Sequence, residues 1–141
     1  MVRKLCTHYI KGKGRLALAF FHAGPNDTPT FVDFETFTLH VDHGLWEDAE
    51  LGVPEAREKI AHEIGHIFLH NRGMRSFTND AGGAIKFAEK EHSAEWQAHC
   101  FARYFLLPLR FVQQQTDAIV AASNANVPLR IAEVQIAIAN D

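Results

Sequence analysis

One segment in the middle of the chain carries the residues best suited to chemistry. The stretch KIAHEIGHIFLH, residues 59–70, places His62, His66 and His70 four residues apart, with Glu63 between the first two. Helical side chains four residues apart lie about 5–6 Å from one another, so the rings of His62 and His66 can converge on one metal ion. Glu63 is rotated by about 100° from His62. It therefore flanks the pair and can reach a water molecule without binding the ion, which is the HExxH arrangement for metal-assisted hydrolysis.

The HExxH pentapeptide alone leaves another interpretation open. It fixes only three positions, and matches also occur in helices that bind no metal. A helix that carries histidines can equally form a solvated surface. We expect His70 to be a rim or structural residue rather than a ligand. The side of the helix with Ile60, Ile64 and Ile67 should pack into the core.

A catalytic zinc usually has three protein ligands and one open position, so a third ligand must come from elsewhere. Glu95 lies in the helical segment HSAEWQAHCFARYFLLP, residues 92–108, and follows His66 by 29 residues (95 minus 66), which leaves room for a loop and a returning helix. Small and apolar residues share its helix face, so we expect a buried carboxylate that needs a partner or a metal. The alternative partner is an arginine such as Arg57 or Arg72.

His99 lies one turn after Glu95, on nearly the same side of that helix. It could hydrogen-bond a metal ligand or donate to a developing oxyanion. The alternative is a half-buried histidine that is satisfied by the backbone. His92 is a second candidate for the oxyanion donor, whereas Tyr104 falls about 180° from Glu95 and should face away. The remaining aromatic residues of this helix are most simply core: Trp96, Phe101 and Phe105.

Along the chain, the predicted strands come first and the predicted helices follow them, and this order indicates an α+β domain. Residues 15–21 read as a buried strand. Residues 36–42 read as a half-buried strand, because apolar and polar residues alternate there. Residues 22–30 are rich in turn-forming residues, and a polar loop is expected at about residues 73–83. Helices are expected at about residues 54–71, 92–107, 109–123 and 128–139.

Composition narrows the class of protein. A chain of 141 residues fits one domain over residues 1–141, and 47% hydrophobic with 22% charged residues is ordinary for a globular protein. A net charge of -3 argues against a large phosphate-binding surface and direct binding to nucleic acid. Cys6 and Cys100 form no CxxC motif and favour reduced thiols in a cytoplasmic protein. The apolar run at residues 16–21 is too short for a signal peptide or a membrane span.

The two helical motifs together resemble the ImmA/IrrE family of zincin-like metalloproteins, which is common in bacteria, phages and mobile elements. The family helix motif AHExGHxxLH is matched by residues 61–70. The second family motif is E-x-x-A-(Asn or Asp)-x-F-A-x-x-L-L-x-P. It is matched at Glu95, Ala98, Phe101, Ala102, Leu106, Leu107 and Pro108. The resemblance covers about residues 52–108 and, less closely, the N-terminal strands.

The resemblance implies a zincin-like α+β fold, with a short N-terminal β-sheet packed on the HExxH helix and three further helices after it. It implies a zinc metalloendopeptidase with Zn2+ held by His62, His66 and Glu95, and with Glu63 as the general base. Members of the family typically act on DNA-binding transcriptional repressors. The expected partner is therefore a protein substrate such as a helix-turn-helix repressor, with no direct binding of nucleic acid or membrane.

The chain departs from the family pattern in two places. His99 stands where the family has Asn or Asp, and an imidazole accepts a hydrogen bond only when it is neutral. The chain also begins close to the first predicted strand, so we expect neither extra N-terminal helices nor a fused DNA-binding domain. These departures keep an alternative function open, in which zinc only fixes the fold of a non-catalytic regulatory module that relieves repression by docking a partner.

Overall fold

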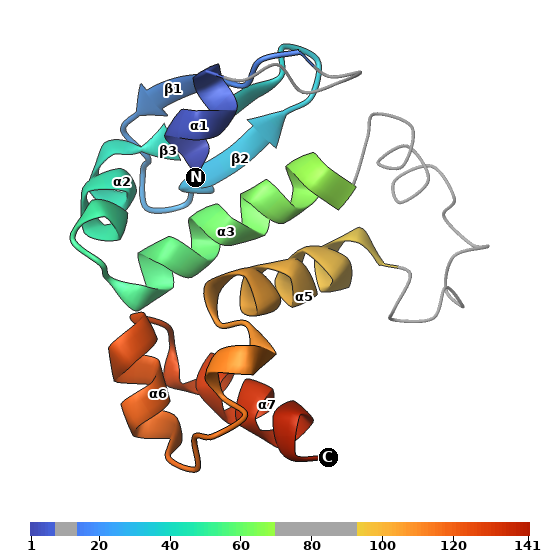
Figure 1. Ribbon diagram of the computed structural model, residues 1–141. Coiled ribbons are helices and arrows are strands. Elements are labelled where there is room, and N and C mark those ends of the chain that lie inside the picture. Colours follow the sequence, from blue (N-terminus) through green and yellow to red (C-terminus); the bar gives the residue numbers. More distant parts are fainter. Residues whose placement is uncertain (8–13, 70–92) are drawn as a thin grey trace, which may run out of the picture.

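The computed structural model describes residues 1–7, 14–69 and 93–141. Figure 1 shows a small sheet on one side of the long helix α3 and the helix α5 on the other, which confirms the predicted α+β fold. The predicted loop at about residues 73–83 lies outside the described residues, as do the candidates His70, Arg72 and His92. The elements in chain order are α1 (Val2–Thr7), β1 (Ala17–Phe21), β2 (Thr30–Asp33), β3 (Thr38–Asp42), α2 (His43–Glu50), α3 (Pro54–Leu69), α5 (Ala94–Leu106), the 3-10 turn Leu109–Phe111, α6 (Ala118–Ala125) and α7 (Leu129–Asn140).

The sheet places β3 in the centre, between β1 and β2. β1 pairs with β3 in parallel and β2 pairs with it antiparallel, so that Leu39 lies beside both Leu18 and Val32. Val32 and Leu39 are almost completely buried, in one cluster with Ile64 and Ile67 of α3. Successive side chains of a strand point to opposite faces of the sheet. The apolar face of this sheet therefore packs against the HExxH helix, as predicted.

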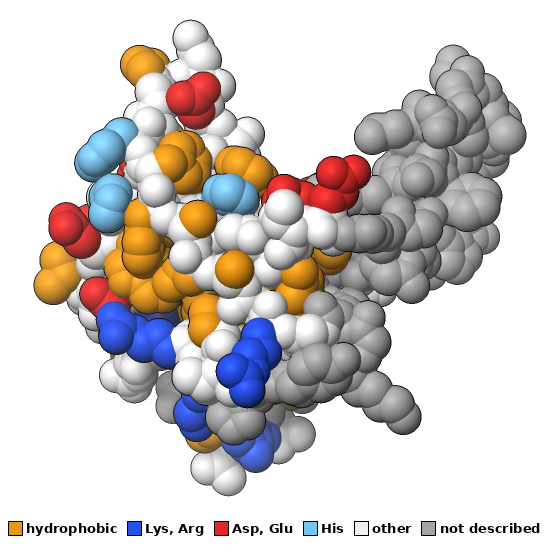
Figure 2. Space-filling view, turned by 90° about the horizontal axis from the view of Figure 1, so that it is seen from above, with side chains coloured by type: hydrophobic (Ala, Val, Ile, Leu, Met, Phe, Trp, Pro, Cys, Tyr) orange, Lys and Arg blue, Asp and Glu red, His pale blue; other side chains and the backbone are white. Residues whose placement is uncertain are grey.

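The opposite face of the sheet carries aromatic side chains. Phe31 stacks on His40 with ring centroids 4.6 Å apart, and Phe21 meets Phe31 edge-on at 6.0 Å. Phe31 is 40% exposed. Figure 2 looks down on the molecule from the side that holds the sheet in Figure 1, and there hydrophobic side chains lie among histidine and acidic side chains. We call Phe21, Phe31 and His40 the aromatic surface.

The strands differ from the predicted ones in detail. Both predicted strands form with shorter bounds, but β2 lies partly in a segment predicted as a loop. β2 has only 4 residues, too few for its alternation of buried Thr30 and Val32 with exposed Phe31 to stand out in the sequence. The prediction of a buried first strand is wrong, since Phe20 of β1 is 42% exposed. β1 is an edge strand, where side chains have fewer neighbours.

Two helices were not predicted, namely α1 and α2. Asp42 starts α2, because its carboxylate accepts a hydrogen bond from the backbone N–H of Leu45 at 3.0 Å. Backbone hydrogen bonds from Ala23 and then Leu45 hold the pKa of Asp42 below its usual value, so the capping group stays charged. Leu45 and Trp46 then pack against the core beside α3.

The C-terminal helices form a second hydrophobic cluster, which includes Leu107 at the end of α5. The predicted helix at residues 109–123 is wrong: a 3-10 turn comes first and α6 begins only at Ala118. Asp117 sets that start, because its side chain accepts hydrogen bonds from the N–H groups of Ile119 and Val120. No helix among the described residues is both long and apolar enough to cross a bilayer.

Candidate metal centre

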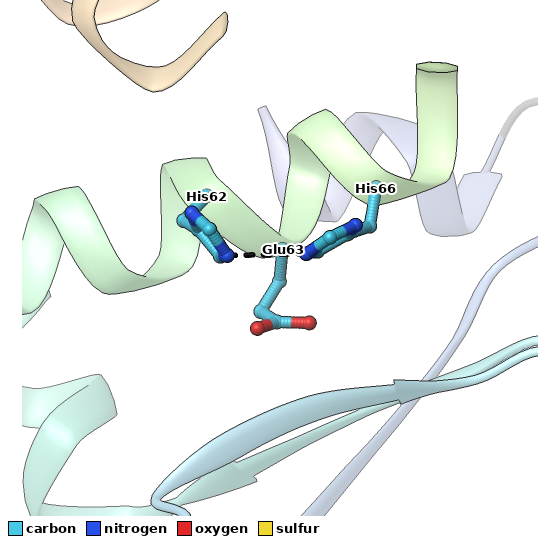
Figure 3. Close-up of side chains that lie close together, drawn as sticks. All are labelled: His62, Glu63 and His66. Atoms are coloured by element: carbon cyan, nitrogen blue, oxygen red, sulfur yellow. Dashed lines mark hydrogen bonds between the residues drawn. The ribbon is translucent and has the colours of Figure 1, made fainter. Parts of the chain in front are cut away.

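α3 presents the three residues of the HExxH motif from one side, as Figure 3 shows. The Nε2 atoms of His62 and His66 are 3.1 Å apart, and their rings are nearly perpendicular. His66 is 2% exposed and Glu63 is 9% exposed, so both side chains are buried. The helix therefore brings the two predicted imidazoles to a common point, with the carboxylate of Glu63 beside them.

α5 brings Glu95 to the same point from a distant part of the chain. Ser93 begins this helix, because its Oγ accepts a hydrogen bond from the N–H of Trp96 at 3.1 Å. Glu95 lies in the first turn, with Oε2 3.1 Å from His62 Nε2 and Oε1 3.2 Å from His66 Nε2. The structure thus places the predicted third candidate ligand against both histidines.

The burial expected for Glu95 is wrong, although the expected convergence is present. Its side chain is 71% exposed, against 14% for His62 and 3% for His66. Ala98 and Ala102 of α5 are the residues buried against α3, and Glu95 reaches the histidines from the solvent side. The alternative pairing with Arg57 is also wrong, because that guanidinium donates to the backbone carbonyls at the end of α6.

Gly65 allows the two helices to come this close. A Cβ at this position would lie 3.1 Å from Cα and 3.1 Å from the carbonyl oxygen of Ala98, and 3.2 Å from Cβ of Phe101. Gly65 is the glycine of the AHExGHxxLH motif, but sequence reasoning assigned it no role in packing. The available signal was a glycine inside a helix, which is unfavourable by about 1 kcal/mol relative to alanine and so suggests a close approach of backbone.

The donor set fits a metal ion. The three donor separations are 3.1, 3.1 and 3.2 Å, close to the separation of about 3.3 Å between ligands that surround a tetrahedral ion at about 2.0–2.1 Å. The site offers two imidazole nitrogens and one carboxylate, which is a common donor set for catalytic zinc. Two overlapping groups of possible ligand atoms lie within 4.8 Å of one another among the described residues: His62, Glu63 and His66, and His62, Glu95 and His99.

The environment of His62 favours its neutral form, which is the form that binds metals. Burial lowers the pKa of His62 below its ordinary value, and the nearby His99 lowers it further, whereas the Glu95 carboxylate acts in the opposite direction. The ring of His99 lies 4.3 Å from that of His62, centroid to centroid. His62 therefore keeps a lone pair available at pH values where an ordinary histidine begins to protonate.

This lowered pKa predicts a pH dependence for the metal-free protein. Between the pKa of folded His62 and the ordinary value of 6.5, the unfolded chain binds more protons than the folded one, so stability rises with pH. We therefore expect the free energy of unfolding to fall as the pH is lowered from about 6.5. Urea unfolding of metal-free wild type and His62→Gln at several pH values measures this. An equal slope in both proteins would contradict the assignment.

The cap of α5 gives a second prediction. Replacement of Ser93 by alanine removes the hydrogen bond to the N–H of Trp96, which costs about 1 kcal/mol of stability for a typical cap. Glu95 lies in this first turn, so fraying should also weaken metal binding. Thermal unfolding and a metal titration measure the two effects. Ser93→Asp keeps an N-cap acceptor and should restore both, and a failure to do so would show that the cap does not act in this way.

A pocket of about 400 Å3 opens beside these residues. Its wall includes His62, Glu63 and His99, together with Thr30 of β2 and Arg130 of α7. Sequence analysis missed the last two, since neither belongs to a motif, and only the tertiary fold brings them to the site.

The aromatic residues of α5 lie outside this pocket wall. Trp96 and Phe101 are half-buried, as core residues would be. Phe105 is 39% exposed, so the prediction that it belongs to the core is wrong. Tyr104 is also exposed and lies under the guanidinium of Arg103.

Comparison with known proteins agrees with this geometry. The model of one protein family, described as Peptidase_M78, IrrE N-terminal-like domain, matches residues 27–132, which include α3 and α5 in full. A search of curated proteins found no match. The matched region carries the HExxH histidines and the acid that faces them, and the chain belongs to the IrrE N-terminal-like family of metallopeptidase type.

Proposed function

We propose that the protein is a zinc-dependent endopeptidase that cleaves a DNA-binding repressor or a similar regulatory protein. The observation that carries the proposal is the meeting of His62, His66 and Glu95, from two helices, at mutual distances of 3.1 to 3.2 Å. Membership of a metallopeptidase family supports it. The donor set of two imidazoles and one carboxylate is one that catalytic zinc commonly uses, and it supports zinc as the metal.

His62, His66 and Glu95 would hold the ion. A bound zinc supplies a Lewis acid that polarises the scissile carbonyl and lowers the pKa of water at the site toward about 7. Glu63 acts as the general base, taking a proton from the attacking water and passing it to the leaving amine. Its carboxylate has an atom within 4.8 Å of ring nitrogens of both histidines, and Glu63 also lines the pocket that opens beside them.

His99 is our first candidate for the group that stabilises the carbonyl oxygen as it becomes negative. Its imidazole lines the same pocket as Glu63 and can donate a hydrogen bond from a ring N–H. The family has Asn or Asp at this position, and either side chain is shorter than histidine. His99 therefore extends further toward His62 than the usual residue would.

The substrate backbone needs a partner, and the sheet offers one. β3, the strand within the predicted range 36–42, is paired on both sides, so it has no free edge for a substrate. β2 lies at the edge of the sheet, next to α3, and its first residue Thr30 lines the pocket. An extended peptide can add to such an edge through main-chain hydrogen bonds, which would place its scissile bond near Glu63.

A protein partner also suits the surface and the charge. The aromatic surface offers apolar area for a protein contact. The net charge of -3 disfavours nucleic acid but complements a basic DNA-binding protein. Cys6 and Cys100 are both free thiols, which agrees with a reducing compartment such as the cytoplasm.

The proposal is tested by incubating the zinc-loaded protein with candidate helix-turn-helix repressors from its source organism. We expect wild type to produce repressor fragments with defined ends, and Glu63→Gln to leave the repressor intact while still binding zinc. A general base contributes about 10²–10⁴-fold to a rate, so the difference is readily seen on a gel and by mass spectrometry. Equal amounts of intact repressor with both proteins would overturn the peptidase assignment.

One observation favours a second function, in which zinc is structural and the protein docks a repressor without cleaving it. His99 lies close enough to His62 and Glu95 to compete for the same ion. Under this function, Glu63→Gln relieves repression as well as wild type does, and Glu95→Ala does not. A reporter gene under control of the repressor distinguishes the two functions.

A further inference from the structure

Each of the two helices of the site carries a pair of possible ligands four residues apart. α3 carries His62 and His66, and α5 carries Glu95 and His99. Because Gly65 lets the helices approach closely, the two pairs face one another across the interface. A site of this kind contains four potential donors, one more than a catalytic zinc usually takes from its protein.

The position of His99 brings its ring to the donors already described. Its centroid is 4.3 Å from that of His62, and the planes are inclined by 53°. Ligand atoms of His62, Glu95 and His99 lie within 4.8 Å of one another. A rotation of the exposed His99 side chain therefore suffices to bring a ring nitrogen to an ion held by the other three residues.

We propose that His99 is a fourth, displaceable ligand, which closes the metal centre until a substrate arrives. This inference rests on the proposed zinc site. Structural zinc centres have four protein ligands, whereas catalytic ones keep one position for water or substrate. On substrate binding, the His99 nitrogen would leave the metal, and an oxygen of substrate or water would take the vacated position. The freed imidazole is then available to donate a hydrogen bond to the carbonyl oxygen.

This arrangement would restrain a peptidase that has no substrate. A closed centre cannot activate water, so neighbouring proteins are protected until the correct chain pairs with the site. Displacement of a ligand also requires binding free energy from the rest of the substrate, which favours long, well-fitted chains over short peptides. Asparagine in place of His99 is shorter and has only a neutral amide, so it should leave the fourth position open.

The experiment uses full-length protein loaded with zinc for X-ray absorption and with Co2+ for visible spectroscopy, in the absence of substrate. We expect wild type to show three imidazoles at the metal and His99→Asn to show two, with a changed cobalt spectrum. Azide probes the open position, and we expect it to bind His99→Asn at least about tenfold more tightly than wild type, because the competent state is more populated. His22→Asn, a matched change in an exposed loop, should behave as wild type.

Two imidazoles at the metal in wild type, with equal azide affinity in both proteins, would overturn the inference while leaving the proposed zinc site intact. Failure of wild type to bind one metal ion would overturn the zinc site and this inference together. The imidazole count in wild type decides the question by itself, so the inference stays testable even where His99→Asn folds poorly.

Discussion

Replacement of Glu95 by alanine should give a folded protein that no longer retains its metal ion. The change removes the donor that lies 3.1 Å from His62 and 3.2 Å from His66. Mutation of a residue that only hydrogen-bonds to a metal ligand typically lowers the metal affinity by about 10–100-fold. Loss of a ligand itself should therefore weaken zinc binding by more than about a hundredfold. Peptide hydrolysis should disappear with the metal.

Stability and metal binding are expected to respond differently to this change. The Glu95 side chain is 71% exposed, and exposed substitutions usually alter the free energy of unfolding by less than about 0.5 kcal/mol. Chemical unfolding of the metal-free proteins and competition with a chelating dye measure the two quantities separately. Glu133→Ala, which removes an exposed acid from α7, is the matched control and should bind zinc normally. Near-normal zinc affinity in Glu95→Ala would exclude this residue as a ligand.

Much of the site was predictable because it depends on short-range helical geometry. The relation between His62 and His66 holds in any α-helix, whatever surrounds it. The meeting with Glu95 required a second motif and enough chain for a returning helix. The exposure of Glu95 was not predictable, since it depends on the position of α5 along the axis of α3. The packing around Gly65 determines this position, and the periodicity of a single helix carries no information about such packing.

The fold was predictable where elements are long and periodic. The two helices of the site, α3 and α5, fall within about two residues of their predicted bounds. The short elements α1, β2 and α2 were missed, because segments of 4 to 8 residues take their structure largely from neighbours. The start of α6 at Ala118 depends on one side chain, Asp117, whose carboxylate accepts hydrogen bonds from two backbone N–H groups.

Gly65→Ala tests whether the close approach of the two helices makes the site. On helix propensity alone the change should stabilise α3 by about 1 kcal/mol. The new Cβ, however, would lie 3.1 Å from two backbone atoms of Ala98, which cannot rotate away as a side chain could. Overpacking of this kind costs about 1–3 kcal/mol. We therefore expect a net loss of stability and a displacement of α5, which carries Glu95 away from the histidines.

The expected result is a zinc affinity reduced by at least about tenfold, since even small displacements of ligands and their supports weaken metal sites. Gly44→Ala is the matched control, because it makes the same change in α2, where the new Cβ would approach only the carboxylate of Asp42. That variant should keep wild-type zinc affinity. A Gly65→Ala protein that is more stable than wild type and binds zinc equally well would show that α5 can move without disturbing Glu95. The geometry of the centre would then be set by the side chains of its ligands, with no contribution from the packing of its helices.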